Sequence, residues 1–94
     1  MIEDSAMTVI VIDEDSHGMI GIAKNYYNAA RWLIEQHWID NLTDCWDDSV
    51  NKWRPIEEIL GKDWQKIITD YWDIEKFNDF FYGSFYLEIV EVIQ

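Results

Sequence analysis

One segment, residues 25–38 (NYYNAARWLIEQHW), has a clear helical period. Its inward-facing positions recur every three or four residues and form one stripe: Tyr26, Ala29, Ala30, Leu33, Ile34 and His37. Asn25 is the expected N-cap, because its side chain can accept a hydrogen bond from a free amide of the first turn. A helix with one apolar stripe needs a surface to cover, so this segment constrains the fold more than any other.

The residues before this helix predict a β-hairpin. Residues 7–12 (MTVIVI) and 19–23 (MIGIA) are short and rich in β-branched side chains, and the polar residues 13–18 (DEDSHG) suit a turn. Gly21 predicts either a β-bulge or a close approach by another element. A single hairpin cannot bury its own apolar face, so the helix is expected to lie on it.

The C-terminal residues 85–93 (FYLEIVEVI) predict a third strand. We expect it beside residues 7–12, the strand whose length it matches best. Its alternation of apolar and polar side chains breaks at Ile89 and Val90. This break predicts either a bulge or a strand covered on both faces.

The region between the first helix and the last strand is less regular. Residues 39–53 have no clean period and are expected to form a loop with at most one helical turn, held by Trp46 and Trp53. Pro55 is expected to begin a short helix that Gly61 ends.

Two further helices are expected before the last strand. Residues 62–72 predict a helix with four side chains on its inner face: Trp64, Ile67, Ile68 and Tyr71. Asp73 is a good cap for the next helix, whose Ile74, Phe77 and Phe81 should point inward and which Gly83 should end.

The predicted fold class is therefore α+β, with the order β-β-α-α-α-β for the main elements. The simplest packing is a three-stranded antiparallel sheet with helices on one face. A chain of 94 residues is expected to form a single domain. Residues 1–6 are expected to be a disordered extension, unless Met7 is an alternative start.

Charge is the unusual part of the composition. Nineteen acidic residues face seven Lys and Arg, giving a net charge of -12, and residues 1–23 and 32–51 contain no Lys or Arg. Such a chain repels nucleic acid and anionic membranes and is attracted to basic surfaces. The alternative is that the acidity only supports solubility. An apolar content of 49% argues against a disordered chain.

No pattern for metal binding or catalysis is complete. Asp13, Asp15 and Gly18 resemble the start of a calcium loop, but Lys24 occupies the position of the essential glutamate. The lone Cys45 excludes an internal disulfide and fits a reducing cytosol, and its acidic neighbours would raise the thiol pKa. No apolar run is long enough for a membrane span. We therefore expect a protein that is not an enzyme and has no cofactor.

The hairpin VIVIDEDSHGMIGIA, the segment YYNAARWLIEQHWID and the closing FYLEIVEVI, in a small acidic chain, carry a resemblance. The chain resembles small accessory proteins encoded by phages and mobile elements of Gram-positive bacteria, among which anti-CRISPR proteins that inhibit Cas9 are the best known. The resemblance implies a non-enzymatic inhibitor in the cytoplasm of a bacterial host. Its partner would be a basic nucleic-acid-binding protein, above all a Cas nuclease, with no direct contact to nucleic acid or membrane.

A Cas nuclease holds nucleic acid in a basic channel and reads its recognition site with arginines, so a carboxylate surface can act there as a DNA mimic. The expected contact residues are Asp40, Asp44, Asp47 and Asp48 with Trp46 as an apolar anchor, and Asp13, Glu14 and Asp15 as a second patch. The alternative function is a structural or regulatory interaction module with incidental acidity, able to form a homodimer through an exposed strand edge.

Overall fold

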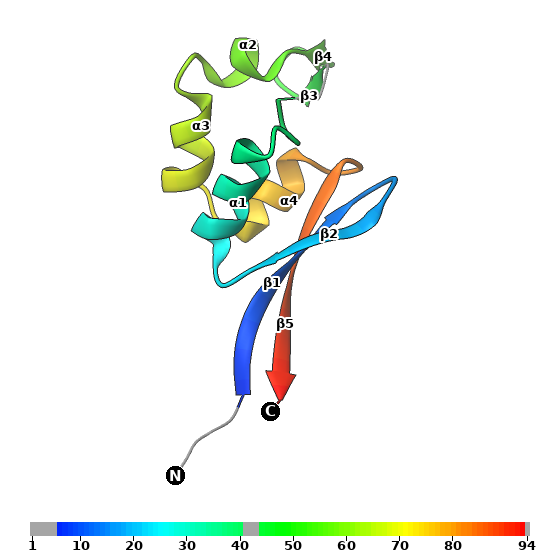
Figure 1. The fold of residues 1–94 in the computed structure, drawn as a ribbon. Helices are drawn as coiled ribbons and strands as arrows, with labels where there is room; N and C mark the ends of the chain where they lie inside the picture. The colour runs from blue at the N-terminus through cyan, green and yellow to red at the C-terminus, as the bar shows by residue number, and fades with distance from the viewer. Residues whose placement is uncertain (1–5, 41–43, 94) are drawn as a thin grey trace.

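The computed structural model of the chain describes residues 6–40 and 44–93. Its main sheet has three antiparallel strands in the order β2-β1-β5: β1 (Ala6–Glu14), β2 (Gly18–Ala23) and β5 (Phe85–Ile93). The predicted α+β class and the place of the last strand beside the first are confirmed (Figure 1). Ala6 was expected in a disordered extension, but it pairs with Ile93; the rest of that expected extension lies outside the described residues.

The helices cover one face of this sheet: α1 (Tyr26–Glu35), α2 (Ile56–Leu60), α3 (Trp64–Lys66), the π-helix η1 (Ile67–Tyr71) and α4 (Ile74–Phe80). The predicted caps are confirmed, since Asn25 accepts from the amide of Asn28 and Asp73 accepts from that of Lys76. The first helix ends at Glu35, earlier than predicted. His37 therefore leaves the apolar stripe and lies exposed with a positive φ of 63°.

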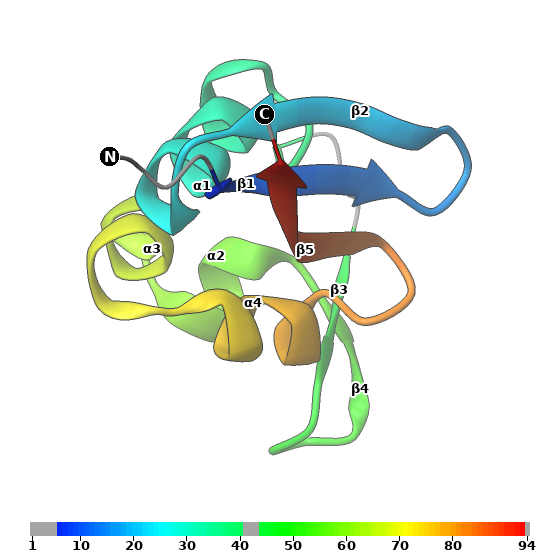
Figure 2. The same ribbon diagram turned by 90° about the horizontal axis from the view of Figure 1, so that it is seen from below.

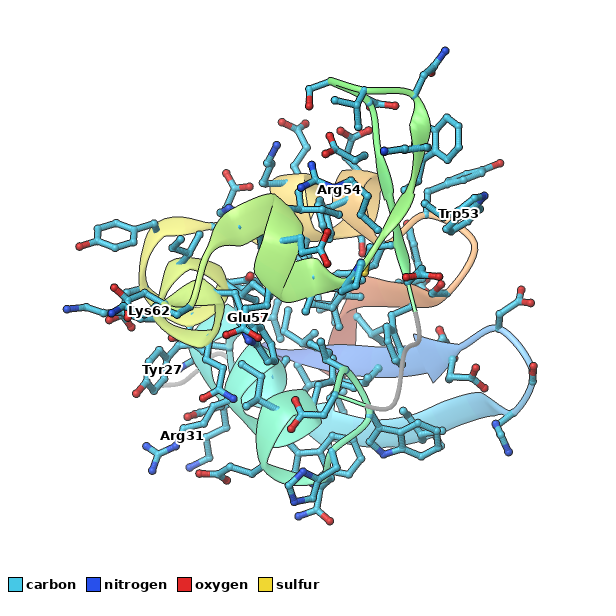
Figure 3. The ribbon with its side chains drawn as sticks, turned by 90° about the horizontal axis from the view of Figure 1, so that it is seen from above. Tyr27, Arg31, Trp53, Arg54, Glu57 and Lys62 are labelled. Atoms are coloured by element: carbon cyan, nitrogen blue, oxygen red, sulfur yellow. The ribbon has the colours of Figure 1, made fainter. Side chains whose placement is uncertain are left out.

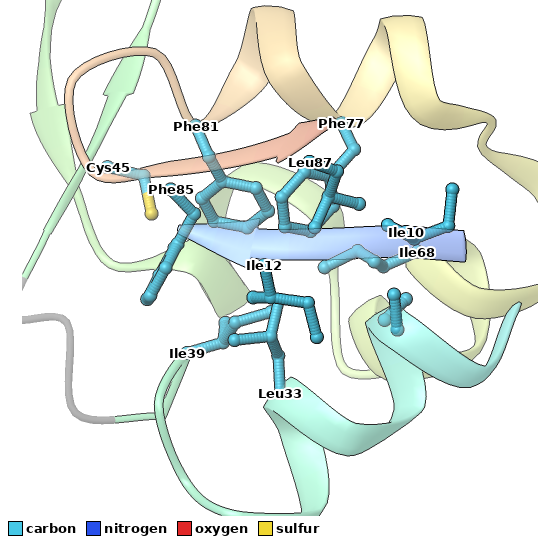
Figure 4. Packing of buried hydrophobic residues seen from close by; sticks show 12 residues of the cluster. Ile10, Ile12, Leu33, Ile39, Cys45, Ile68, Phe77, Phe81, Phe85 and Leu87 are labelled. Atoms are coloured by element: carbon cyan, nitrogen blue, oxygen red, sulfur yellow. The ribbon is translucent and has the colours of Figure 1, made fainter. Parts of the chain in front are cut away.

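The core lies between the sheet and helices α1 and α4 (Figure 4). Helix α1 contributes Ala29, Ala30 and Leu33, whose small and medium side chains let it lie close to the strands. The largest fully buried side chains are Ile12, Leu33, Ile39, Ile68, Phe77 and Leu87. The aromatic ring of Phe77 packs against that of Phe81, with centroids 4.6 Å apart.

Residues 45–54 form a second, two-stranded sheet, where a loop with at most one helical turn was expected over residues 39–53. Strand β3 (Cys45–Asp47) pairs antiparallel with β4 (Lys52–Arg54). Figure 2 shows this hairpin projecting away from β1 and β2. Strands of three residues are too short to show a period in the sequence, and the turn depends on Asn51, which adopts a positive φ of 58°.

Two further expectations are wrong. Tyr71 was placed on the inner face of its helix, but it is exposed, because η1 is a π-helix with wider turns and a different angular spacing. Strand β5 has neither a bulge nor two covered faces: its register with β1 is continuous, and Ile89 is 59% exposed. The bulge lies in the β1–β2 pairing, after Ile12.

The outer edge of β5 is partly covered by a side chain. Asn78 of α4 donates through Nδ2 to the carbonyl of Leu87 (2.9 Å) and accepts through Oδ1 from its amide (2.7 Å). The side chain thus takes the place of a neighbouring strand at this residue. Past Leu87, the ends of β1 and β5 run beyond the helices as a two-stranded arm (Figure 1).

The predicted close approach at Gly21 is confirmed. A Cβ added there would lie 3.2–3.4 Å from three carbon atoms of the Trp32 indole. Replacing Gly21 with Val should therefore lower the free energy of unfolding by about 1–3 kcal/mol, through overpacking. Chemical denaturation followed by circular dichroism would measure this loss.

A double-mutant cycle tests the cause. In a Trp32→Leu background, the same valine should cost clearly less, because the indole that it meets is gone. An equal cost in both backgrounds would show that the indole is not the reason for a glycine at this position.

Candidate partner-binding groove

The β3–β4 hairpin presents a pair of tryptophans. Trp46 and Trp53 face each other across the two strands, with ring centroids 5.5 Å apart and an edge-to-face angle of 69°. Trp46 is 39% exposed and Trp53 is 63% exposed. In Figure 3, Trp53 points away from Arg54, its neighbour in the strand. The hairpin thus holds a large apolar surface in contact with solvent.

The opposite face of the hairpin is tied to the body by Asp47. This buried carboxylate accepts hydrogen bonds from the amide and hydroxyl of Ser49 and from Nη1 of Arg54 (2.7 Å). Arg54 in turn donates to the carbonyl of Glu58 in α2. The hydrogen bond from the Ser49 hydroxyl, with a smaller contribution from Arg54, lowers the pKa of the Asp47 carboxyl below its usual value.

Asp48 orients the neighbouring indole. Its carboxylate accepts a hydrogen bond of 2.6 Å from Nε1 of Trp46 and remains exposed. A charge-assisted hydrogen bond of this kind fixes the position of the ring relative to the hairpin. Trp46 and Asp48 therefore form one rigid unit with an apolar face and a negative charge.

A groove of about 450 Å³ runs between the hairpin, α2 and the segment from Trp72 to Tyr82. Five aromatic side chains line it: Trp46, Trp53, Trp72, Phe80 and Tyr82. Its ionisable lining residues are three aspartates and one lysine: Asp47, Asp48, Asp79 and Lys76. Since Arg54 neutralises Asp47, the carboxylates that face a ligand are those of Asp48 and Asp79.

The structure brings only part of the predicted contact set into this groove, namely Trp46, Asp47 and Asp48. The Asp47 carboxylate is already hydrogen-bonded to Ser49 and Arg54, so it stabilises the hairpin and is not free to bind a partner. Asp44 is exposed just before β3, and Asp40 is paired with His37 (3.2 Å).

The second predicted patch lies elsewhere, at the β1–β2 turn. Asp13, Glu14 and Asp15 line a hollow of about 300 Å³ with Tyr86 and its neighbours. Glu14 accepts from two turn amides and pairs with His17, and this hydrogen bond lowers the pKa of Glu14. Its carboxylate therefore stabilises the turn.

The wall of the groove that α4 provides was not among the predicted contact residues. Lys76, Asp79 and Phe80 recur at intervals of three and one, which places them on one face of α4 beside its core-facing residues, and Trp72 joins them from the extended segment before the Asp73 cap. This second face of α4 is visible in the sequence. The contribution of Trp53 was hidden because it depends on the hairpin, which has no sequence signal.

The structure gives Cys45 no reactive character. Its side chain is buried, and burial followed by the nearby Asp44 charge raises the pKa of the thiol to about 11. Across residues 6–40 and 44–93, no three His, Cys, Asp or Glu side chains are placed to hold a metal ion. None of the helices in these ranges is both long and apolar enough to cross a membrane.

Comparisons with protein-family models, with curated proteins and with solved structures find no match to this chain.

The role of Asp47 predicts a pH dependence. Because its folded-state pKa is lowered, the carboxylate stabilises the fold fully above the ordinary aspartate pKa of about 3.9, and this contribution is lost as the pH falls through the lower folded value. Asp47→Asn should reduce stability at neutral pH, and the difference from wild type should shrink in acid. Thermal unfolding from pH 7 to acid would measure it.

Asp63→Asn is the matched control, because Asp63 is exposed and its side chain caps no amide. It should follow the wild-type curve. Equal stability of Asp47→Asn and wild type at neutral pH would contradict the role assigned to this carboxylate.

Proposed function

We propose that the protein is a non-enzymatic inhibitor of the anti-CRISPR type, which binds a Cas nuclease in the cytoplasm of a bacterial host and blocks its binding of DNA. The observation that supports this most is the groove, where exposed tryptophans stand beside two carboxylates that form no salt bridge among the described residues, those of Asp48 and Asp79. Aromatic side chains next to charged groups are frequent sites of strong binding in protein interfaces.

The overall charge favours a basic partner. Three acids of the described residues are in ion pairs with arginine, namely Glu35, Asp47 and Glu58, and two more, Glu14 and Asp40, are hydrogen-bonded to histidines. The nineteen acids and seven bases of the whole chain give a net charge of -12, about the phosphate charge of six base pairs of duplex DNA. Such a surface can occupy a site that binds a short stretch of duplex, and it is attracted from a distance at low salt.

Charge reversal tests the proposal. Asp48→Lys with Asp79→Lys should abolish capture of a guide-loaded Cas nuclease and restore its cleavage of DNA, because both changes lie in the groove. Wild-type inhibition should weaken steeply from low to high salt. Pull-down against several nucleases, with and without guide RNA, followed by cleavage assays, measures both effects.

The matched control is Asp63→Lys with Glu88→Lys, which changes the net charge equally but lies away from the groove. It should retain most of the inhibition. Capture of no nuclease by the wild-type protein would overturn the proposed function, and equal loss in both double variants would show that only total charge matters.

A second candidate function is a homodimeric interaction module, favoured by the open arm of β5. Pairing of two β5 strands about Val90 would place Ile89 opposite Glu91 and Glu88 opposite Val92, so no acid would face an acid. Among the residues that the structure describes, the Asn78 side chain is bonded to this edge at Leu87, and no hydrogen bond from another element reaches the edge beyond it. Strand edges without Pro or Lys are prone to such pairing.

This candidate predicts the opposite response to salt. Dimer formation should strengthen at high salt, because two chains of charge -12 repel each other less when screened. Sedimentation at several protein concentrations would measure the mass. Ile89→Lys should keep the protein monomeric, and a wild-type monomer under every condition would exclude the dimer.

A further inference from the structure

The groove between the hairpin and α4 already holds a cation on its aromatic wall. The ammonium nitrogen of Lys76 lies 5.6 Å from the ring centroid of Trp72. At this distance the electron-rich face of an indole attracts a positive charge. The same groove therefore has one aromatic surface that carries a cation from the chain itself, and others that carry none within the described residues.

Two aromatic side chains of the groove, one from the hairpin and one from the turn after α4, carry no cation within the described residues. Trp53 is 63% exposed and Tyr82 is 89% exposed, and both line the groove. Asp48 and Asp79 supply negative charge to the same space. With Asp47 neutralised by Arg54, two carboxylates stand against the one ammonium of Lys76, so the groove favours a further positive charge.

We propose that this groove binds an arginine side chain of the partner protein, with the guanidinium stacked on Trp53 and paired with a carboxylate of Asp48 or Asp79. The inference deepens the proposed function by naming the chemical group that the site recognises, and it rests on that proposal. A guanidinium is planar, weakly hydrated and able to bond both oxygens of a carboxylate, whereas a lysine ammonium is compact and strongly hydrated. The combination of flat aromatic faces with carboxylates therefore selects arginine over lysine.

The Lys76 side chain competes with an incoming arginine for the aromatic surface and the negative charge of the groove. Its ammonium occupies the Trp72 face and repels an incoming cation, so its removal frees aromatic surface and makes the groove more negative. The backbone of Lys76 is held independently of its side chain, because its amide donates to the Asp73 cap. A Lys76→Gln change therefore leaves the start of α4 intact and should strengthen binding.

Titration with two short peptides tests the inference. The probes are blocked hexa-arginine and blocked hexa-lysine, which carry equal charge, and tryptophan fluorescence reports binding. We expect hexa-arginine to bind about two- to fivefold more tightly, as an exposed cation–π contact allows. Lys76→Gln should tighten both by roughly threefold, since one repelling charge is removed near the site.

Two variants separate stacking from charge. Trp53→Leu should abolish the preference for arginine, while Asp63→Asn, away from the groove, should weaken both peptides slightly and leave the preference unchanged. Circular dichroism and amide spectra check that the hairpin of Trp53→Leu is folded. If the hairpin is lost, Trp53→Phe, which keeps a smaller aromatic face, should reduce the preference in part.

Each outcome has one meaning. Equal affinity for the two peptides, or a preference that Trp53→Leu leaves intact, overturns the inference, as does equal binding of a neutral apolar peptide. Arginine preference without capture of any Cas nuclease would keep the inference and remove the proposed partner. Inhibition of a nuclease that survives Trp53→Leu would keep the proposed function and show that the groove is not its contact.

Discussion

The pairing of β1 with β5 is the constraint on which the rest of the structure depends. It joins the two ends of the chain in one continuous register, from Ala6 opposite Ile93 to Glu14 opposite Phe85. The segment that connects β2 to β5 must therefore begin and end at the same sheet. Because a sheet of this size needs a cover on one face, the intervening helices fold onto it, and Phe77 and Leu33 meet Ile12 and Leu87 in the core. Closing so long a segment costs chain entropy, and burial of apolar side chains between the sheet and the helices offsets this cost.

The β3–β4 hairpin is stable only through contacts with the rest of the protein, because two strands of three residues cannot be stable alone. A buried carboxylate holds it: Asp47 is satisfied by Ser49 and Arg54, and Arg54 reaches the carbonyl of Glu58 in α2. Burying a charge is costly unless it is paired and hydrogen-bonded, so this network fixes one position of the hairpin. The two tryptophans on its other face are consequently presented in a defined geometry.

The regular elements of the fold could be predicted, because their signals are local. The stripe from Tyr26 to Leu33, the caps Asn25 and Asp73, and the alternation at Phe85 and Leu87 each follow from the spacing of a few residues. The hairpin could not be predicted, because its register depends on contacts with Arg54 and the body rather than on its own period. The exposure of Tyr71 depends in turn on a π-helix, which simple helical spacing does not anticipate.

The candidate site shows the same division between local and tertiary information. The sequence identifies Trp46 and Asp48 as an aromatic and an acid in a segment without bases, but it counts Asp47 as equivalent to Asp48. Strand β3 ends at Asp47, whose carboxylate is buried and used for folding, whereas Asp48 is the first residue of the turn and its carboxylate faces the groove. The acidic residues thus divide into those that are hydrogen-bonded within the fold and those that face solvent. The net charge counts both groups and therefore overstates the negative charge that a partner protein can contact. The groove therefore selects a cation by its position as well as by its charge. A bound cation must contact the aromatic rings and lie next to Asp48 or Asp79 at the same time.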